Sequence, residues 1–352
     1  MERHEVPFMK ERLLLACALP AIAGLLLIPS ADLYYKSSRG EGCARCHEIR
    51  ANFDSWRGST HRKLNCTECH SSTTQTNMRR VSTHISGNAP EQIHLQTDDV
   101  FAMADKCRGC HQQEFAQWSS SAHSATYARI FATAEHNQKR LLMDDCLRCH
   151  GMHFEGSIAD MVQPVDTKGP WKLADAALAN RPAIPCLACH AMHREGQPMV
   201  KVAERVPGKE EIARPSLGFF DRRSRTNIRM DALALPAMYE GARAVRISPD
   251  NRQALCYQCH AALAAAQVGS GDDRTPVGVH EGISCLGCHQ NHSQNTRQSC
   301  ASCHPRLSNC GLDVARMDTT FANLKSPHNI HTVKCIDCHP KGVPKKHVER
   351  NP

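Results

Sequence analysis

The longest apolar stretch of the chain lies close to its N-terminus, where residues 13–31 carry no charged side chain. The run from Leu13 to Pro29 is 17 residues long, at the lower limit of the roughly 17 to 25 residues that a membrane-spanning helix needs. The basic residues Arg3, Lys10 and Arg12 precede it, which agrees with a cytoplasmic N-terminus. The pattern predicts one membrane anchor within residues 1–35.

A cleaved signal peptide is the alternative, with a cleavage site after the small residues around Ser30. A lipoprotein at Cys17 is less favoured, because little apolar sequence precedes that cysteine. We favour the retained anchor, because the apolar region exceeds the roughly 7 to 15 residues of a signal peptide. Tyr34 and Tyr35 follow the run and suit the aromatic belt of a membrane surface.

The remaining pattern is that of short helices and loops, and the alternation typical of strands is nearly absent. Residues 191–255 contain five prolines and scattered charges, which predicts a connector with one short helix near Asp231 to Val245. Aromatic residues make up only 5% of the chain, too few to fill several conventional cores. Something other than apolar side chains must therefore provide buried surface.

Cysteine and histidine supply that alternative. The chain has 20 cysteines and 22 histidines, and chance placement would produce about 0.07 copies of the pattern CxxCH. There are nine copies. They begin at Cys43, Cys66, Cys107, Cys146, Cys186, Cys256, Cys285, Cys300 and Cys335; their second cysteines are Cys46, Cys69, Cys110, Cys149, Cys189, Cys259, Cys288, Cys303 and Cys338.

CxxCH is the attachment pattern of c-type haem, in which two cysteines hold the porphyrin and the next histidine binds the iron. The predicted iron ligands are His47, His70, His111, His150, His190, His260, His289, His304 and His339. Zinc ribbons and disulfides also use CxxC pairs, but neither explains a histidine after every second cysteine. We predict nine c-type haems, with Cys17 and Cys310 left over as small apolar residues.

The predicted fold class follows from this count: a multihaem cytochrome c of short α-helices and loops wrapped around covalent haems, with little β-structure and one N-terminal transmembrane helix. A haem recurs about every 35 to 40 residues, too little chain for a packed layer without cofactor. The connector divides the exported part into a five-haem region, residues 36–190, and a four-haem region, residues 256–352. The formal charge of +8 is offset by roughly eighteen haem propionates, so no nucleic-acid partner is inferred.

Thirteen histidines lie outside the motifs, and His4 among them falls on the cytoplasmic side. Three repeated patterns mark candidates for the second axial position: Trp-x-x-Ser-x-His, CHxxH, and a histidine five residues before a motif. The candidates are His61, His94, His123, His153, His193, His280, His292, His328 and His331. An exposed or hydrogen-bonded ring is the alternative for each, and the favoured one for the unpatterned His84, His94, His136 and His347.

In CHxxH, a continuing helix would place both histidines on one face. The second histidine must then reach the iron of a different haem, so His153, His193 and His292 predict neighbouring haems in close contact. The pair His328 and His331 before Cys335 resembles class III cytochromes c, where such a pair serves two haems, although its second gap is one residue shorter here.

Cys43 to His70, together with the anchor, resembles the start of membrane-anchored quinol-oxidising cytochromes of the NapC/NirT type. The resemblance implies quinol oxidation at the haem nearest the membrane, where Glu48, Asp54 and Lys63 are candidate proton acceptors or plain surface charges. Ile49 stands where that family usually has methionine. The first haem is therefore five-coordinate or takes a histidine from elsewhere.

The sequence predicts an electron-transfer protein, with most of the chain in the periplasm or otherwise outside the cytoplasm, that relays electrons to a redox protein or respiratory complex. We expect no catalytic residues. The alternative is a multihaem oxidoreductase that converts a small nitrogen or sulfur compound at an iron with an open position. A third reading, a structural subunit whose haems bridge other subunits, differs from the first in having a stable partner.

Overall fold

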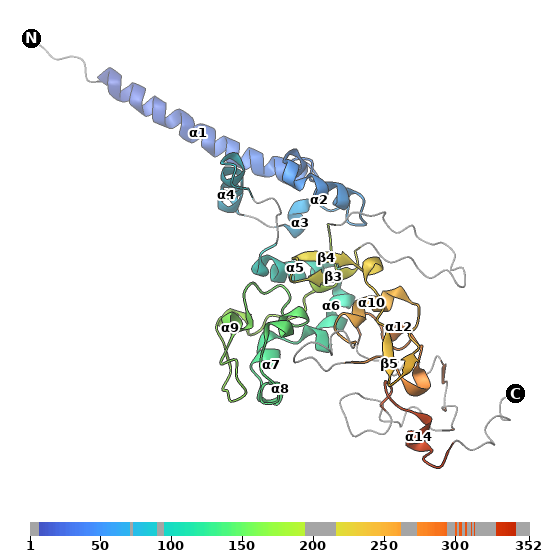
Figure 1. Ribbon diagram of the computed structural model, residues 1–352. Coiled ribbons are helices and arrows are strands. Elements are labelled where there is room, and N and C mark those ends of the chain that lie inside the picture. The colour runs from blue at the N-terminus through green and yellow to red at the C-terminus, as the bar shows by residue number, and fades with distance from the viewer. Residues whose placement is uncertain are drawn as a thin grey trace, which may run out of the picture. The chain divides into compact units, whose positions relative to one another are not determined.

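The computed structural model describes residues 7–70, 73–89, 95–193, 216–261, 273–293, 300, 303–304, 307, 311, 313 and 329–342 (Figure 1). Two compact units divide the chain, the first formed by residues 1–94 and 193–198 and the second by the rest. The predicted division into a five-haem region, a connector and a four-haem region stays a prediction.

The first unit is helical where it is described. Its elements are α1 (Pro7–Ser37), η1 (Cys43–Arg45), α2 (His47–Arg57), α3 (Cys66–Cys69) and α4 (Thr74–Ile85). In α1, the stretch Ala16–Ser37 is 22 residues long with a mean hydropathy of 1.8 and no buried part. By length and composition, α1 is a helix of the kind that serves as a signal or a membrane anchor.

The end of α1 is tied to the first CxxCH motif. The guanidinium of Arg45 lies 5.2 Å from the centre of the Tyr34 ring, a cation–π contact. Gly40 has a φ of +85°, and a Cβ there would lie 2.8 Å from Cys66 Sγ. The chain therefore leaves α1 through a tight glycine turn against the second motif.

The second unit consists of short helices and three two-stranded antiparallel hairpins among the described residues. Its helices are α5 (Thr97–Cys110), α6 (Gln112–Ser119), η2 (Ala122–Ser124), α7 (Tyr127–Phe131), α8 (Ala134–Asn137), η3 (Asp144–Arg148), α9 (Ile158–Met161), η4 (Ala176–Leu178), η5 (Cys186–Ala188), η6 (Met230–Ala232), η7 (Asn251–Gln253), α10 (Ala254–Tyr257), η8 (Gly278–His280), α12 (Cys285–Cys288) and α14 (Cys335–Cys338). Its hairpins are β1 (Val162–Gln163) with β2 (Lys172–Leu173), β3 (Gly218–Asp221) with β4 (Thr226–Arg229), and β5 (Met238–Glu240) with β6 (Arg243–Val245). The predicted content of short helices with little sheet agrees with this architecture.

The helix predicted near Asp231 to Val245 is wrong. The structure has a 3₁₀ turn there, followed by the β5–β6 hairpin, in which Met238 pairs with Val245. Pro236 has no N–H to donate and interrupts any helix through this stretch. Gly241 has a φ of +61° and forms the turn, which reverses the chain into two strands.

Two small apolar clusters hold the second unit together, and both contain residues of the motifs. One packs Tyr127, Phe131 and Met161 around Leu147, which stands inside the motif that begins at Cys146. The other packs Phe219 and its neighbours around Ala188, inside the motif that begins at Cys186. Apolar packing of the chain therefore positions the motifs themselves.

Candidate haem sites

The CxxCH motifs share one local geometry. In eight of the nine, the backbone N–H of the histidine donates to the carbonyl of the first cysteine, at 2.7 to 3.0 Å. This closes one helical turn, which brings residues three and four apart to the same face. Each such motif therefore presents two thiols and one imidazole together, as attachment of a single porphyrin requires.

Several of these turns carry their own caps. The N–H of Asn65 donates to Glu68 Oε1 at 2.8 Å, and the N–H of Lys334 donates to Asp337 Oδ2 at 2.7 Å. Both acceptors lie inside motifs, as the residue before the second cysteine. A carboxylate at this place satisfies an orphan donor at the start of a very short helix and so stabilises the turn.

Three histidines of motifs in the second unit face a histidine from another part of the chain. The ring centres of His260 and His123 are 6.1 Å apart, and those of His190 and His292 are 6.2 Å apart. The rings of His289 and His331 lie 6.1 Å apart and within 25° of parallel. In each pair the second histidine is a predicted axial candidate.

The first unit contains a pair of the same kind. His70 Nε2 lies 3.4 Å from His193 Nε2, and the ring centres are 5.7 Å apart. His193 Nδ1 donates to the carbonyl of Asn52 at 3.1 Å, which leaves the lone pair on Nε2, the nitrogen that faces His70. Burial lowers the pKa of His193, which favours the neutral ring that a metal binds.

His280 and His304 are brought near one another as well. Burial is the main cause that lowers the pKa of His280, and the charge of His304 contributes to the same shift. The Nδ1 atoms of both rings are buried without a hydrogen-bond partner. His280 was predicted from its place five residues before Cys285.

These pairs fit a shared ion between two imidazoles. A metal–imidazole bond is about 2 Å long, so two nitrogens on one ion lie about 4 Å apart and their ring centres about 6 Å apart. The observed ring separations of 5.7 to 6.2 Å agree with that value. The residues present therefore suit a haem iron with histidine on both faces.

Cysteines of different motifs are also in contact. The thiols of Cys43 and Cys66 hydrogen-bond, which lowers the pKa of Cys43 to about 7 and raises that of Cys66. The same contact joins Cys107 to Cys186, Cys149 to Cys259 and Cys256 to Cys285. None of the cysteines whose side chains the structure describes forms a disulfide, so those in the motifs are available for attachment of haem.

Comparison with protein families supports the chemistry. Residues 106–191, which contain three of the motifs, match the family described as cytochrome c554 and c-prime. The chain is a multihaem c-type cytochrome. Proteins of this class carry electrons and hold their haems outside the cytoplasm. Searches of the curated proteins and of the solved structures found no match.

His153 of the cytochrome occupies a different environment from the paired histidines. Its ring stacks on Phe220 with centres 4.0 Å apart, and its Nε2 is buried without a hydrogen-bond partner. Burial lowers the pKa of His153 to about 4, and the charge of Arg225 adds to this shift. The ring of this candidate packs on an aromatic side chain and hydrogen-bonds to the backbone of Leu187.

The other candidates remain predictions. Trp56 Nε1 donates to the carbonyl of His61 at 3.0 Å, which fixes the backbone at that candidate. His94 and His328 lie outside the described residues, as do His4, His347 and Cys310. The premise that a helix continues through CHxxH is wrong for His289, because α12 ends at Cys288 and His289 is extended.

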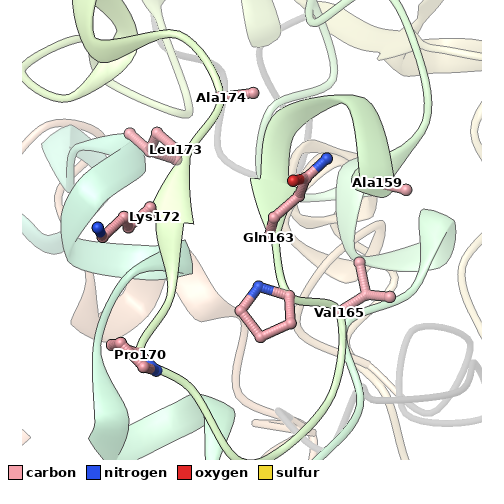
Figure 2. Close-up of a pocket in the computed structure, with 8 residues that line it drawn as sticks. Ala159, Gln163, Val165, Pro170, Lys172, Leu173 and Ala174 are labelled. Carbon is pink, nitrogen blue, oxygen red and sulfur yellow. The ribbon is translucent and has the colours of Figure 1, made fainter.

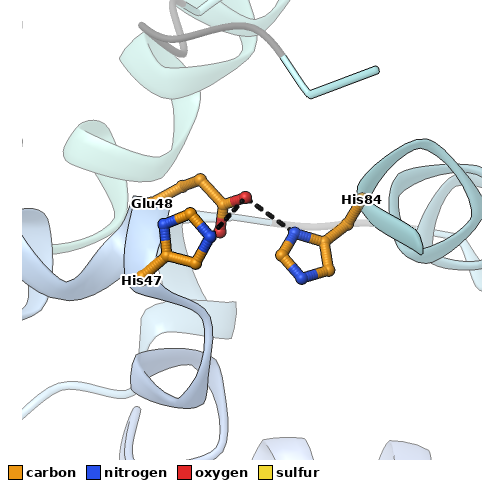
Figure 3. Close-up of side chains that lie close together, drawn as sticks. All are labelled: His47, Glu48 and His84. Atoms are coloured by element: carbon orange, nitrogen blue, oxygen red, sulfur yellow. Dashed lines mark hydrogen bonds and ion pairs between the residues drawn. The ribbon is translucent and has the colours of Figure 1, made fainter. Parts of the chain in front are cut away.

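The first motif of the cytochrome contains a contact that the sequence patterns missed (Figure 3). His84, on α4, lies with its ring centre 5.7 Å from that of His47, at the start of α2. The carboxylate of Glu48 lies 2.7 Å from His84 Nδ1 and 3.4 Å from His47 Nε2. Hydrogen bonds from its own backbone N–H and from His84 lower the pKa of Glu48. No repeat marks His84, so its contacts with Glu48 and His47 become visible in the structure alone.

Two hollows lie among the described residues of the cytochrome. One of about 740 Å³ lies between β1 and β2, where Gln163, Val165, Pro170 and Lys172 line an open surface without acidic, histidine or cysteine side chains (Figure 2). The second, of about 390 Å³, lies at the end of α1 and is lined by Phe53, Trp56 and three arginines. The second adjoins the first motif, because Glu41, two residues before Cys43, lines it.

Proposed function

We propose that this cytochrome relays electrons through nine c-type haems, most of them bound by histidine on both faces, from membrane quinol to a redox partner outside the cytoplasm. The observation that carries the proposal is the set of facing imidazoles: His70 with His193, His260 with His123, His190 with His292, and His289 with His331. A c-type haem supplies an iron that exchanges single electrons. An iron with two protein ligands has no position left for a substrate, which favours transfer over catalysis.

The contacts between motifs support rapid transfer within the second unit. Thiols that hydrogen-bond belong to porphyrin attachment points in direct contact, as for Cys149 with Cys259 and Cys256 with Cys285. The histidine pairs connect further motifs, since His292 follows one motif and faces the histidine of another. A histidine that follows one motif and binds the iron of another motif would hold the two motifs, and their haems, close together.

The anchor and the hollow at its end support quinol as the donor. A hollow of about 390 Å³ falls within the range of roughly 300 to 1,000 Å³ that small-molecule sites occupy. Its aromatic side chains, Phe53 and Trp56, suit a quinol ring, and Arg57 and Arg62 supply hydrogen-bond donors. Asp54, one of the predicted proton acceptors, lies on the same helix as Phe53 and Trp56, with its carboxylate 3.5 Å from Arg50 Nε.

Reduction by quinol tests the donor. Full-length cytochrome in lipid vesicles is mixed with a menaquinol analogue, and haem reduction is followed by visible absorbance. We expect reduction of wild-type protein and slower reduction of Trp56→Ala, because the quinol ring would lose its aromatic contact. Trp118→Ala is the matched control, since that tryptophan lies in the second unit. Failure of wild-type protein to be reduced would remove quinol from the account.

Ligand binding tests transfer against catalysis. Carbon monoxide, nitrite, hydroxylamine or tetrathionate is added to the reduced protein, and the spectrum is recorded before and after. Irons with two histidine ligands have no vacant position, so we expect no rapid change at most haems. Rapid binding or turnover of nitrite, hydroxylamine or tetrathionate would instead favour the oxidoreductase reading.

A further inference from the structure

Helix α4 presents an apolar stripe that none of the described residues covers. Met78, Val81 and Ile85 stand at positions i, i+3 and i+7, so they share one face of the helix. Their exposed fractions are 62%, 53% and 78%. Three large apolar side chains in one exposed row differ from the singly scattered apolar residues of an ordinary protein surface, and such a row marks a site of contact.

A helix as short as α4 needs packing against its apolar face. It has 12 residues, and isolated helices shorter than about 12 to 15 residues are marginal in water. Thr73 caps the first turn by accepting a hydrogen bond from the N–H of Thr76 at 3.1 Å, but none of the described side chains of α4 is buried. The apolar contact that stabilises α4 therefore comes from outside the described residues.

The remaining faces of α4 carry positive charge. Arg79 and Arg80 follow Met78 directly, so they point away from its face, and the helix contains no Asp or Glu. Both arginines are exposed, and their long side chains can reach a polar layer beside an apolar one. An apolar stripe on a helix with basic side chains elsewhere is typical of a helix that lies in the surface of a membrane with anionic lipids.

Contacts within the first unit connect α4 to the end of the predicted anchor. Gly42, directly before the first motif, lies so close to the rings of Tyr34 and Tyr35 that a Cβ there would be 2.9 Å from both. The first motif leads into α2, and Glu48 of α2 lies 2.7 Å from His84 of α4 (Figure 3). The last turn of α4 is thereby tied to the part of the chain where two tyrosines suit a membrane surface.

We infer that α4 lies on the membrane surface as a second attachment of the first unit, with the stripe of Met78, Val81 and Ile85 in the lipid and both arginines at the phosphates of anionic phospholipids. The inference rests on the proposed membrane position of the cytochrome, but not on the identity of its electron donor. A second contact limits tilting of the unit about α1. It also keeps the hollow at the end of α1 near the lipid from which quinol would come.

Photolabelling of the full-length holoprotein from within the bilayer tests this contact. The cytochrome is reconstituted in vesicles of phosphatidylethanolamine and phosphatidylglycerol that contain a phospholipid with a diazirine in its acyl chain. After illumination, labelled residues are located by digestion and mass spectrometry. Label on α1 shows that the chain is inserted, and we expect label on Met78, Val81 and Ile85 as well.

A variant with Met78→Gln, Val81→Gln and Ile85→Gln removes the stripe and keeps good helix formers at the three positions. Labelling of α4 should fall roughly tenfold or more, because each of these apolar side chains favours transfer from water into lipid. Labelling of α1 should persist. Tyr239→Gln is the matched control, since Tyr239 is a 68% exposed aromatic residue of the second unit, and the labelling of α4 should not change in it.

Arg79→Gln combined with Arg80→Gln tests the charge of the lipid. Wild-type α4 should be labelled more strongly in vesicles with phosphatidylglycerol than in vesicles of phosphatidylcholine alone, because basic side chains are attracted to an anionic surface. The double variant should lose this difference. Equal labelling of wild-type α4 in the two lipids would contradict the contact with anionic phosphates.

Three results would overturn the inference. Wild-type α4 without label, beside a labelled α1, would exclude contact with lipid, and this result does not depend on whether the glutamine variant folds. An unlabelled α4 together with a wild-type dimer that the glutamine variant loses, measured by light scattering, would assign the stripe to a second copy of the chain. An unlabelled α4 together with a changed haem absorbance in that variant would assign the stripe to packing against a porphyrin.

The proposed function can fail separately from this inference. Label on α4 in vesicles where quinol does not reduce the protein would keep the membrane contact and remove the donor. Reduction by quinol with an unlabelled α4 would keep the donor and remove the contact.

Discussion

His153 and His193 each stand three residues after the histidine of a CxxCH motif, but they lie in different surroundings. His193 directs its Nε2 at His70 and donates from Nδ1 to the carbonyl of Asn52. His153 stacks on Phe220, 4.0 Å away, and its Nε2 has no hydrogen-bond partner. Spacing along the chain is the same for both, so the difference arises from the residues that other segments bring against each ring.

His153 should make the cytochrome less stable in acid. Its pKa is lowered from 6.5 to about 4 in the folded chain, so between these values the unfolded chain binds more protons and stability falls as the pH falls. The pKa shift corresponds to a loss of about 3 kcal/mol in the free energy of unfolding once the pH is below both pKa values. His153→Phe removes this loss, and thermal melting at several pH values between 7 and 4 measures the difference.

The control for this prediction is His136→Ala, which removes an exposed histidine of α8. Its stability should follow that of wild-type protein across the pH range. Parallel pH profiles for wild-type protein and His153→Phe would contradict the assignment of a buried neutral ring.

Short elements rather than long helices position the sites in the second unit. Segment 277–280 lies against segment 331–333, where the N–H of Val277 donates to the carbonyl of His331 at 2.8 Å and that of Val279 to the carbonyl of Val333 at 3.1 Å. These two backbone contacts hold His280 and His331 in place together. A change in the distance between the two segments should therefore disturb the positions of both histidines.

Gly278→Ala should disrupt this contact. Gly278 has a φ of +75°, and a Cβ there would overlap the carbonyl oxygen of Val333. The left-handed conformation costs roughly 1 to 2 kcal/mol for alanine, and displacement of the facing segment adds about 1 to 3 kcal/mol. We expect a lower melting temperature and a rise in high-spin iron, measured by thermal melting and electron paramagnetic resonance.

Gly241→Ala is the matched control for backbone strain. Gly241 has a φ of +61° and open space where its Cβ would lie, so only the strain contribution is expected and the low-spin spectrum should persist. Equal effects of the two substitutions would show that the contact with Val333 does not position His280 and His331.

The sequence predicts an element well where a local pattern of residues is enough to determine it. The turn from Cys285 to His289 follows from the attachment chemistry of its motif, and α1 follows from its apolar run. The β5–β6 hairpin was missed because no alternating pattern marks it, although Pro236 and Gly241 exclude the predicted helix. His84 was missed because its contact with Glu48 joins residues 36 positions apart.

At the scale of the whole molecule, motifs of the second unit meet out of chain order. The third motif contacts the fifth through Cys107 and Cys186, and the fourth contacts the sixth through Cys149 and Cys259. Spacing along the chain does not determine such an order, because loops of similar length close with similar entropy. The order depends on particular side chains that join one motif to another.

Arg148 is one such side chain. It stands inside the fourth motif, and its guanidinium donates to the carbonyl and to Oε1 of Gln258, inside the sixth. It also lies 5.0 Å from the centre of the Phe219 ring. Arg148→Ala should cost about 2 kcal/mol of unfolding free energy, as expected for hydrogen bonds from a charged donor. It should also lower the potential of an adjacent haem, because a positive charge that favours reduction is lost.

Thermal melting and a redox titration measure these two effects. Arg148→Lys should fall between wild-type protein and Arg148→Ala, because an ammonium keeps the charge and loses the planar pair of donors. Arg129→Ala is the control, since that arginine is exposed and contributes its backbone N–H to a helix cap. Potentials that do not change in Arg148→Ala would separate this residue from the haems.

The mass of the denatured, purified full-length protein tests the central claim most directly. Thioether bonds survive denaturation, so the account predicts a chain that carries nine haems, one for each pair of cysteines in a CxxCH motif. A mass that corresponds to fewer haems, or to a chain with zinc and no porphyrin, would contradict it.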